Sequence, residues 1–260
     1  MTLKELIKKP LYRLYEQRLF DRLDRKNLPH HIGVIHDGHR RYAKAAGLTD
    51  YAQSYRVGTQ KFLELLGWAD EVDIPMVTCW LLSKQNLERP SDQLDDLFDV
   101  FIELFESIPQ AVDGQSVEVR FIGSLDLLPP RLAEAAKELQ ERCPIGDRLL
   151  TIALAYGGRQ EIVDATKELV AKLADSGVDP AAMAGHIDAE GIASHLYTSG
   201  MPDPDLVIRT SGEARLSGFL LWQSAYAEYS FVDVYWPAFR RVDFLRALRD
   251  FTMRERRFGR

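Results

Sequence analysis

The stretch with the clearest chemical character covers residues 31–43, HIGVIHDGHRRYA. A short apolar run stops at Asp37-Gly38 and basic residues follow, so we expect a strand that leads into a helix start. The first turn of a helix carries unpaired backbone N–H groups, which attract anions. Asp37 adds a hard oxygen ligand, and Arg40 and Arg41 add fixed positive charge. Together these groups suit a magnesium-bound diphosphate.

Three further polar clusters occur in the chain, at residues 83–89, 209–217 and 254–260. The first two follow apolar, strand-like runs, and ligands in open parallel sheets bind beyond the carboxyl ends of strands. Arg209 and Arg215 flank a Ser-Gly turn, so both guanidinium groups can be aimed at one anion. The alternative is that these arginines are ordinary surface residues beside a turn.

The elements that must position these clusters alternate between strand and helix. Apolar runs at 75–82, 149–155 and 205–209, and an alternating run at 117–122, are typical of strands in a parallel sheet. This alternation predicts a single α/β domain with a central, mostly parallel sheet flanked by helices. Helical spacing is expected at 56–70, 92–108, 130–142, 160–173, 188–197 and 244–253.

The predicted helix at 92–108, with Ser91 as its N-cap, has an apolar arc wider than a single contact with a sheet requires. Two interpretations remain open for it. The helix is either deeply packed in the core, or part of its arc lines an apolar cavity.

Composition excludes several classes of protein. The net charge of −6 argues against a general nucleic-acid binder, which needs a basic surface. Two cysteines, Cys79 and Cys143, give no disulfide framework or cysteine metal site. No apolar run approaches the roughly 20 residues of a membrane span, and the N-terminus lacks a signal-peptide pattern. A cytoplasmic location is therefore expected.

Residues 1–28 form an N-terminal amphipathic helical segment, and residues 29–260 form the expected catalytic domain. Pro10 predicts a helix start or a break near it. Basic residues outnumber acidic ones in the segment. It either lies on an anionic membrane surface, as a peripheral contact at the inner face of the cell membrane, or packs on the domain with a solvated charged face.

Several phosphate-handling and hydrolytic motifs are absent from the sequence. It contains neither a GxxxxGK[ST] loop nor a GxGxxG fingerprint, and no Ser/His/Asp arrangement stands out. His36, Asp37 and His39 resemble ligands of a metal phosphohydrolase, but few other histidines remain to complete such a set. A diphosphate head joined to a long apolar tail fits both the charged clusters and the abundant apolar helix.

Five motifs over residues 31–259 resemble the cis-prenyltransferases, or Z-isoprenyl diphosphate synthases. They are HIGVIHDGHRRYA, LLSKQNLERP, AYGGRQEIVDA, DLVIRTSGEARLSGFLLWQSAYAE and RERRFG. The overall pattern is most similar to that of actinobacterial short-chain Z-farnesyl diphosphate synthases. The resemblance implies a hydrophobic tunnel, a homodimer and Mg²⁺. It also implies condensation of isopentenyl diphosphate with an allylic diphosphate, geranyl diphosphate in the leading hypothesis, to give Z,E-farnesyl diphosphate.

The resemblance also implies roles for individual residues. Asp37 matches the essential magnesium-binding aspartate, and Glu228 matches a second carboxylate associated with magnesium across the dimer. Asn86 matches a catalytic position on a mobile loop. The implied substrate contacts are Gly38, His39, Arg40, Arg41, Tyr42 and Tyr55 around the allylic diphosphate, Ser83 and Arg89 on the loop, Arg209, Arg215 and Ser217 around isopentenyl diphosphate, and Gly259 and Arg260 in a C-terminal segment that reaches the partner's site.

Some positions depart from the family pattern. His39 replaces an asparagine, Tyr42 a tryptophan, Tyr55 a histidine and Leu87 a tryptophan. These changes surround the allylic site, and they leave the role of His39 unassigned.

Leu81 stands where long-chain members of the family have a small residue. Its added volume in a packed wall predicts a stop at farnesyl length, unless the side chain packs away from the tunnel. Two other functions remain open. One is a longer-chain synthase of the decaprenyl or undecaprenyl type, and the other is a non-catalytic partner subunit.

Overall fold

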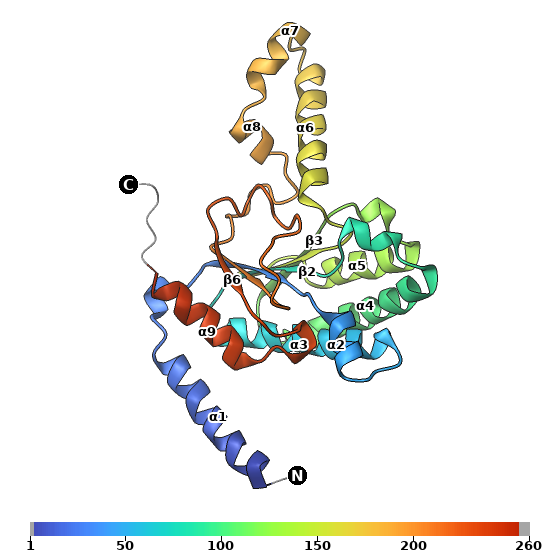
Figure 1. Cartoon of the computed structure of the whole chain (residues 1–260). Coiled ribbons are helices and arrows are strands. Elements are labelled where there is room, and N and C mark those ends of the chain that lie inside the picture. Colours follow the sequence, from blue (N-terminus) through green and yellow to red (C-terminus); the bar gives the residue numbers. More distant parts are fainter. Residues whose placement is uncertain (1–2, 255–260) are drawn as a thin grey trace.

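The computed structural model describes residues 3–254, with side chains from Tyr12 onward, and it is organised around a six-stranded sheet (Figure 1). All neighbouring strands are parallel, in the order β3-β4-β2-β1-β5-β6. The predicted parallel sheet flanked by helices is confirmed. The strands are β1 (His31–Ile35), β2 (Met76–Trp80), β3 (Val117–Ile122), β4 (Arg148–Ala153), β5 (Leu206–Arg209) and β6 (Glu228–Phe231).

The central strands are apolar because helices cover both faces of the sheet. Every residue of β1 and β5 is buried. β6, one of the two edge strands, is half-buried and was not predicted. The helices are α1 (Leu3–Asp21), α2 (His39–Ala45), α3 (Tyr51–Glu71), α4 (Ser91–Ala111), α5 (Pro130–Arg142), α6 (Gly158–Asp175), α7 (Pro180–Met183), α8 (Ala189–Ala193) and α9 (Arg241–Thr252).

Both interpretations of the wide apolar arc apply to helix α4, which is packed in the core and also lines a cavity. Phe98, Val100 and Phe105 are buried in the main core, whereas Leu97 and Phe101 also line a cavity described below. The predicted N-cap is wrong by one position. Ser91 is the first helical residue, and Pro90 occupies the cap position without a side-chain hydrogen bond.

Two helical segments project from the body of the molecule (Figure 1). One is an arm in which α6 extends outward, α7 lies at the tip and α8 returns toward the sheet. The helix expected at 188–197 is therefore only the short α8. The other is α1, which continues through Pro10 without the break that this proline predicted.

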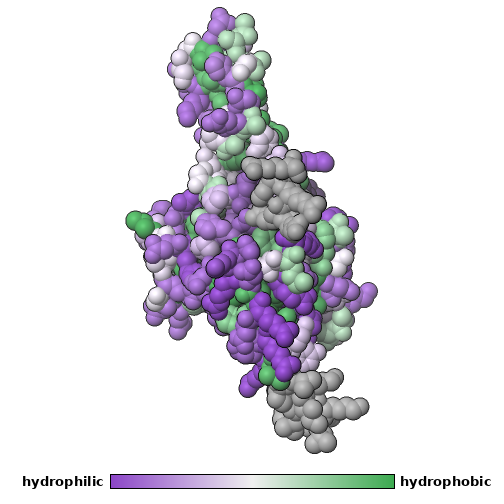
Figure 2. All heavy atoms as spheres, turned by 90° about the vertical axis from the view of Figure 1, so that its left-hand side faces the viewer, coloured by the Kyte–Doolittle hydropathy of each residue, from purple (hydrophilic) through white to green (hydrophobic). Residues whose placement is uncertain are grey.

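Helix α1 packs against α9 through arginine–aromatic contacts. The guanidinium of Arg246 lies 5.2 Å from the Tyr15 ring centre, and that of Arg241 lies 5.1 Å from the Phe20 ring centre. The face in Figure 2 is mainly hydrophilic. Within residues 3–254, no helix is both long and apolar enough to cross a membrane. Cys79 and Cys143 are free and buried.

Candidate functional site

The candidate site begins where β1 ends and the chain turns into α2. Gly38 has a φ of 106°, which L side chains rarely adopt, and a Cβ atom on it would lie 2.8 Å from Cδ1 of Tyr235. The turn therefore requires glycine. Two backbone hydrogen bonds fix it, because the Tyr42 N–H donates to the Gly38 carbonyl and the Trp236 N–H donates to the Asp37 carbonyl.

The Asp37 carboxylate lies between two arginines. Arg209 donates from Nη2 to Oδ2 at 2.7 Å, and Arg41 lies 3.3 Å from Oδ1. Burial alone raises the pKa of this carboxyl, but the hydrogen bonds from Arg209 and Ser211 and the charges of both arginines outweigh burial and lower the pKa. Asp37 is therefore an anion at neutral pH.

The turn after β5 brings the second predicted arginine cluster to Asp37. The buried Arg209 side chain also donates from Nη1 to the Arg215 carbonyl and, at 2.9 Å, to Oγ of Ser217. Ser211 and Ser217 both adopt positive φ angles, of 82° and 53°. Such backbone strain in residues other than glycine is concentrated at functional sites.

Glu213 joins the two clusters, although sequence reasoning assigned it no role. One carboxylate oxygen accepts from Arg41 at 2.9 Å and the other lies 3.1 Å from Arg215. A single acidic side chain thus holds arginines that are far apart in sequence. It also balances part of their positive charge.

His39 is fixed against helix α3. Its Nδ1 donates to the Ser54 carbonyl at 3.2 Å, because a carbonyl can only accept, and this leaves Nε2 as the acceptor of the neutral ring. Burial lowers the pKa of His39 to about 4. Gly58 makes room for the ring, since a Cβ atom there would lie 2.1 Å from Cε1 of His39. Tyr55 lies beside the ring and accepts a long hydrogen bond, 3.4 Å, from Arg89.

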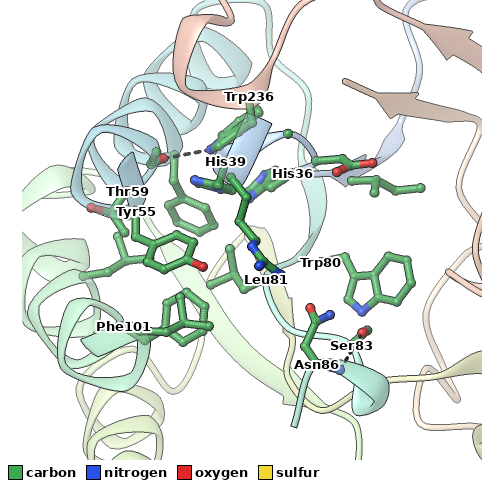
Figure 3. Close-up of a pocket in the computed structure, with 18 of the residues that line it drawn as sticks. His36, His39, Tyr55, Thr59, Trp80, Leu81, Ser83, Asn86, Phe101 and Trp236 are labelled. Atoms are coloured by element: carbon green, nitrogen blue, oxygen red, sulfur yellow. Dashed lines mark hydrogen bonds between the residues drawn. The ribbon is translucent and has the colours of Figure 1, made fainter. Parts of the chain in front are cut away.

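One cavity of about 310 Å³ connects these groups to the apolar helix α4 (Figure 3). Its polar end holds Asp37 and its arginines, and its apolar end is formed by Leu81, Leu97, Phe101 and Leu104. The predicted site residues that line it are Asp37, Gly38, His39, Arg40, Arg41, Tyr55, Leu81, Ser83, Asn86, Arg89 and Arg209.

Other predicted positions lie elsewhere. Ser217 lines a separate cavity beside the start of α6, and Tyr42 and Arg215 do not line the cavity that contains Asp37. Glu228 begins β6, opposite Leu206, and pairs with Arg254 at 3.1 Å. Gly259 and Arg260 lie outside the described residues.

Several aromatic residues of the cavity were not predicted as site residues, among them His36, Trp80 and Trp236. The His36 ring stacks on Trp236 with centroids 3.7 Å apart, and burial lowers its pKa well below the ordinary value. Neither ring nitrogen of His36 has a hydrogen-bond partner among the described residues. The sequence signal for Trp80 was its position directly before Leu81, at the end of a predicted strand.

The acidic groups of the site fit a magnesium ion that is held partly by a phosphorylated substrate. They do not fit a metal site made of protein ligands alone. Within residues 3–254, no group of three or more His, Cys, Asp or Glu side chains forms a potential metal site. Among the described residues that line the cavity, Asp37 alone carries a carboxylate. Mg²⁺ is commonly held by one or two carboxylates together with substrate phosphates, so the residues present fit this ion.

Known proteins are similar to this chain in sequence and in architecture. The family described as "Putative undecaprenyl diphosphate synthase" matches residues 35–259. A (2Z,6E)-farnesyl diphosphate synthase of Thermobifida fusca is 49% identical, covering 98% of this chain and 99% of the relative. A short-chain Z-isoprenyl diphosphate synthase of Mycobacterium bovis is 47% identical, with 98% and 97% covered.

The crystal structure of lavandulyl diphosphate synthase from Lavandula x intermedia, in complex with dimethylallyl diphosphate, has a TM-score of 0.84 and 32% identity. The similarity covers 90% of this chain and all of that one. Sequence and fold therefore agree: the chain belongs to the cis-prenyltransferase family and is a prenyl transferase.

Proposed function

We propose that the protein condenses isopentenyl diphosphate with geranyl diphosphate in a Mg²⁺-dependent reaction of isoprenoid biosynthesis, and that it releases Z,E-farnesyl diphosphate. The observation that carries this proposal is the single cavity, which has an anion-binding end at Asp37 and an apolar end at Leu81 and Phe101. An allylic diphosphate has the same two-part character. The names of the farnesyl and short-chain relatives, and dimethylallyl diphosphate in the lavandulyl structure, support it.

The reaction requires positioned charge more than an acid or a nucleophile. The allylic C1–O bond breaks and its electron pair leaves with the diphosphate. The double bond of isopentenyl diphosphate forms the new C–C bond at C1 of the allylic substrate. The proton lost from C2 of isopentenyl diphosphate passes to a base, such as a diphosphate oxygen. Mg²⁺ bound by Asp37 would supply neutralising charge for the leaving group. Arg40 and Arg41 would hold the allylic diphosphate, and Arg209 the isopentenyl diphosphate, so that the two carbons meet.

The end of the cavity supports a short product. Leu81 directly follows β2 and lines the same cavity as Phe101 and Leu104 of α4. Figure 3 shows Leu81 and Phe101 among the lining residues. Phe101 is itself backed by Phe105, with ring centroids 6.4 Å apart. Walls packed in this way resist displacement by a longer chain. We infer that growth stops after one addition to geranyl diphosphate.

A second copy of the chain would complete the site. Glu228 pairs with Leu206 at the start of β5, whereas Arg209 ends that strand three residues later. At about 3.3 Å per residue, the backbone of Glu228 lies about 10 Å along the strand direction from that of Arg209. We therefore propose a homodimer in which Glu228 serves the partner's site. The C-terminal Gly259 and Arg260 are assigned to the same role.

An acceptor series separates this proposal from a longer-chain synthase and from a non-catalytic subunit. Purified protein is incubated with labelled isopentenyl diphosphate, Mg²⁺ and dimethylallyl, geranyl or farnesyl diphosphate, and kcat/KM is measured for each acceptor. We expect the highest value with geranyl diphosphate. A preference for farnesyl diphosphate with long products would favour the longer-chain synthase, and no incorporation with any acceptor would favour the non-catalytic subunit.

A further inference from the structure

Trp80 is held rigidly at the end of β2. Its ring stacks on Phe219 with centroids 5.4 Å apart and planes 14° apart, and Tyr156 meets it edge-on at 6.3 Å. The residue is 8% exposed and lines the cavity that contains Asp37. Because aromatic neighbours hold its ring, the direction of the indole N–H is fixed by packing.

The Trp80 indole N–H is buried without a hydrogen-bond partner among the described residues. Trp236, another tryptophan of the same cavity, differs in this respect, because its Nε1 donates to the Gly58 carbonyl at 2.9 Å. A buried donor without an acceptor is costly and rare, so it needs an explanation. In Figure 3 the Trp80 nitrogen lies on the side of the ring that faces Ser83 and Asn86, the polar loop that borders the cavity.

A second buried donor in the cavity also lacks an acceptor. Nε of Arg209 has no partner in the described part of the chain, although both terminal nitrogens of that guanidinium are engaged. Indole and guanidinium nitrogens donate and never accept. Two donor-only groups in one cavity point to a ligand rich in acceptor oxygens, which is the character of a diphosphate.

Packing assigns Trp80 to one of the two diphosphates. Phe219, on which the indole lies, is two residues from Ser217, and Ser217 accepts from Arg209. Trp80 thus contacts the segment that carries the proposed isopentenyl diphosphate residues. Building on the proposed function, we infer that the Trp80 indole N–H donates a hydrogen bond to a diphosphate oxygen of isopentenyl diphosphate. Trp80 is then a substrate-binding residue in addition to those predicted from the sequence.

The test is calorimetric titration of isopentenyl diphosphate, with Mg²⁺ and without an allylic substrate, into wild-type and Trp80→Phe protein. Phenylalanine keeps an aromatic ring for the stack and removes the N–H. Since hydrogen bonds to charged groups contribute about 1.5–3 kcal/mol, Kd should rise about tenfold or more. The matched control is Trp68→Phe, because Trp68 packs on Phe239 and Phe244 outside the cavity. Its Kd should equal the wild-type value.

Isosteric replacement of the indole N–H by sulfur, with benzothienylalanine at position 80, keeps the ring shape and guards against a packing defect in Trp80→Phe. It should weaken binding to a similar extent. Equal Kd values for the wild type and both position-80 variants would overturn the inference while leaving the proposed function intact. Weaker binding of geranyl diphosphate alone, with isopentenyl diphosphate unaffected, would also overturn it. If the wild type binds neither diphosphate, the proposed function itself fails.

Discussion

The charges on either side of Asp37 come from two distant segments, and the sequence predicted both. A buried apolar run followed by Asp-Gly defines the end of β1, and a second run followed by Arg209 defines the end of β5. Because the two strands are adjacent and parallel, their ends meet, and Arg209 reaches Asp37 at 2.7 Å. The sequence therefore predicted that each residue lies at a strand end, and the strand order of the structure brings the two together.

The surroundings of His39 could not be predicted in the same way. The ring position depends on the absence of a Cβ atom at Gly58 and on the Ser54 carbonyl, both on α3. Stacking of His36 on Trp236 likewise joins residues 200 positions apart. Neither relation has a local pattern in the sequence, because each depends on how close two packed elements come.

Gly58→Ala should displace His39. The new Cβ atom would lie 2.1 Å from Cε1 of that ring, so either the ring or α3 must move. We expect the free energy of unfolding to fall by about 1–3 kcal/mol and KM for the allylic substrate to rise. Urea unfolding and steady-state kinetics measure the two effects.

Gly67→Ala is the matched control for this substitution. It lies in the same helix, and a Cβ atom there would meet nothing within 4 Å. It should raise the free energy of unfolding by about 0.5–1 kcal/mol, because alanine is the better helix former, and leave KM unchanged. Similar behaviour of the two variants would refute the proposed contact between Gly58 and His39.

At the scale of elements, the end of β2 is expected to set product length. Leu81→Ala removes part of the cavity wall, so products longer than 15 carbons should accumulate in a chain-length analysis with excess isopentenyl diphosphate. The control is Leu82→Val. Leu82 is 1% exposed and packs in the core outside the cavity, so this substitution should cost stability without changing product length. An unchanged product length in Leu81→Ala would show that this wall does not limit chain growth.

Helix α6, which forms the projecting arm, is anchored at its base by a buried acid. Glu161 is fully buried and accepts from the Tyr197 N–H and from the Gln223 side chain, each at 3.0 Å. Burial raises its pKa above the ordinary 4.5 despite these donors. The folded state therefore holds a proton more tightly than the unfolded state does. The stability contributed by Glu161 is present in full below pH 4.5 and is lost as pH rises through the raised pKa.

The stability of the wild type relative to Glu161→Gln should therefore fall between pH 4.5 and the raised pKa, and then level off. Urea unfolding at a series of pH values measures this difference. Glu168→Gln, which replaces an exposed acid on the same helix, is the matched control. A difference between wild type and Glu161→Gln that grows with pH would contradict the assigned direction of the pKa shift.

One element that sequence analysis missed is β6. Its residues are only partly buried, and it forms the edge of the sheet, so neither a continuous apolar run nor a clean alternation marks it. Glu228 could be assigned from the family motif, but its distance from Asp37 within one chain follows only from the strand register. That register supports the proposal that Glu228 serves the site of a second copy.

At the scale of the whole molecule, the proposed dimer makes a prediction about mixed subunits. Asp37→Asn and Glu228→Gln should each lose turnover as homodimers. If Glu228 serves the partner's site, a mixed dimer has one site that lacks both carboxylates and one site that lacks neither.

Unfolding and refolding the two variants together at equal concentration should make about half of the dimers mixed. Because each mixed dimer has one intact site of two, about a quarter of wild-type activity should be recovered. The two variants refolded separately and then assayed together should stay inactive until subunits exchange. No recovery after joint refolding would place Glu228 in its own chain's site or outside catalysis.

The central claim is that one cavity holds a geranyl-length chain and a diphosphate and allows a single extension. Its most direct test is chain-length and double-bond analysis of the product formed by the wild-type protein from geranyl diphosphate, Mg²⁺ and excess labelled isopentenyl diphosphate. The account predicts one labelled product of 15 carbons with a new Z double bond, formed only when Mg²⁺ is present. A ladder of longer products, a new E double bond, or no labelled product would contradict it.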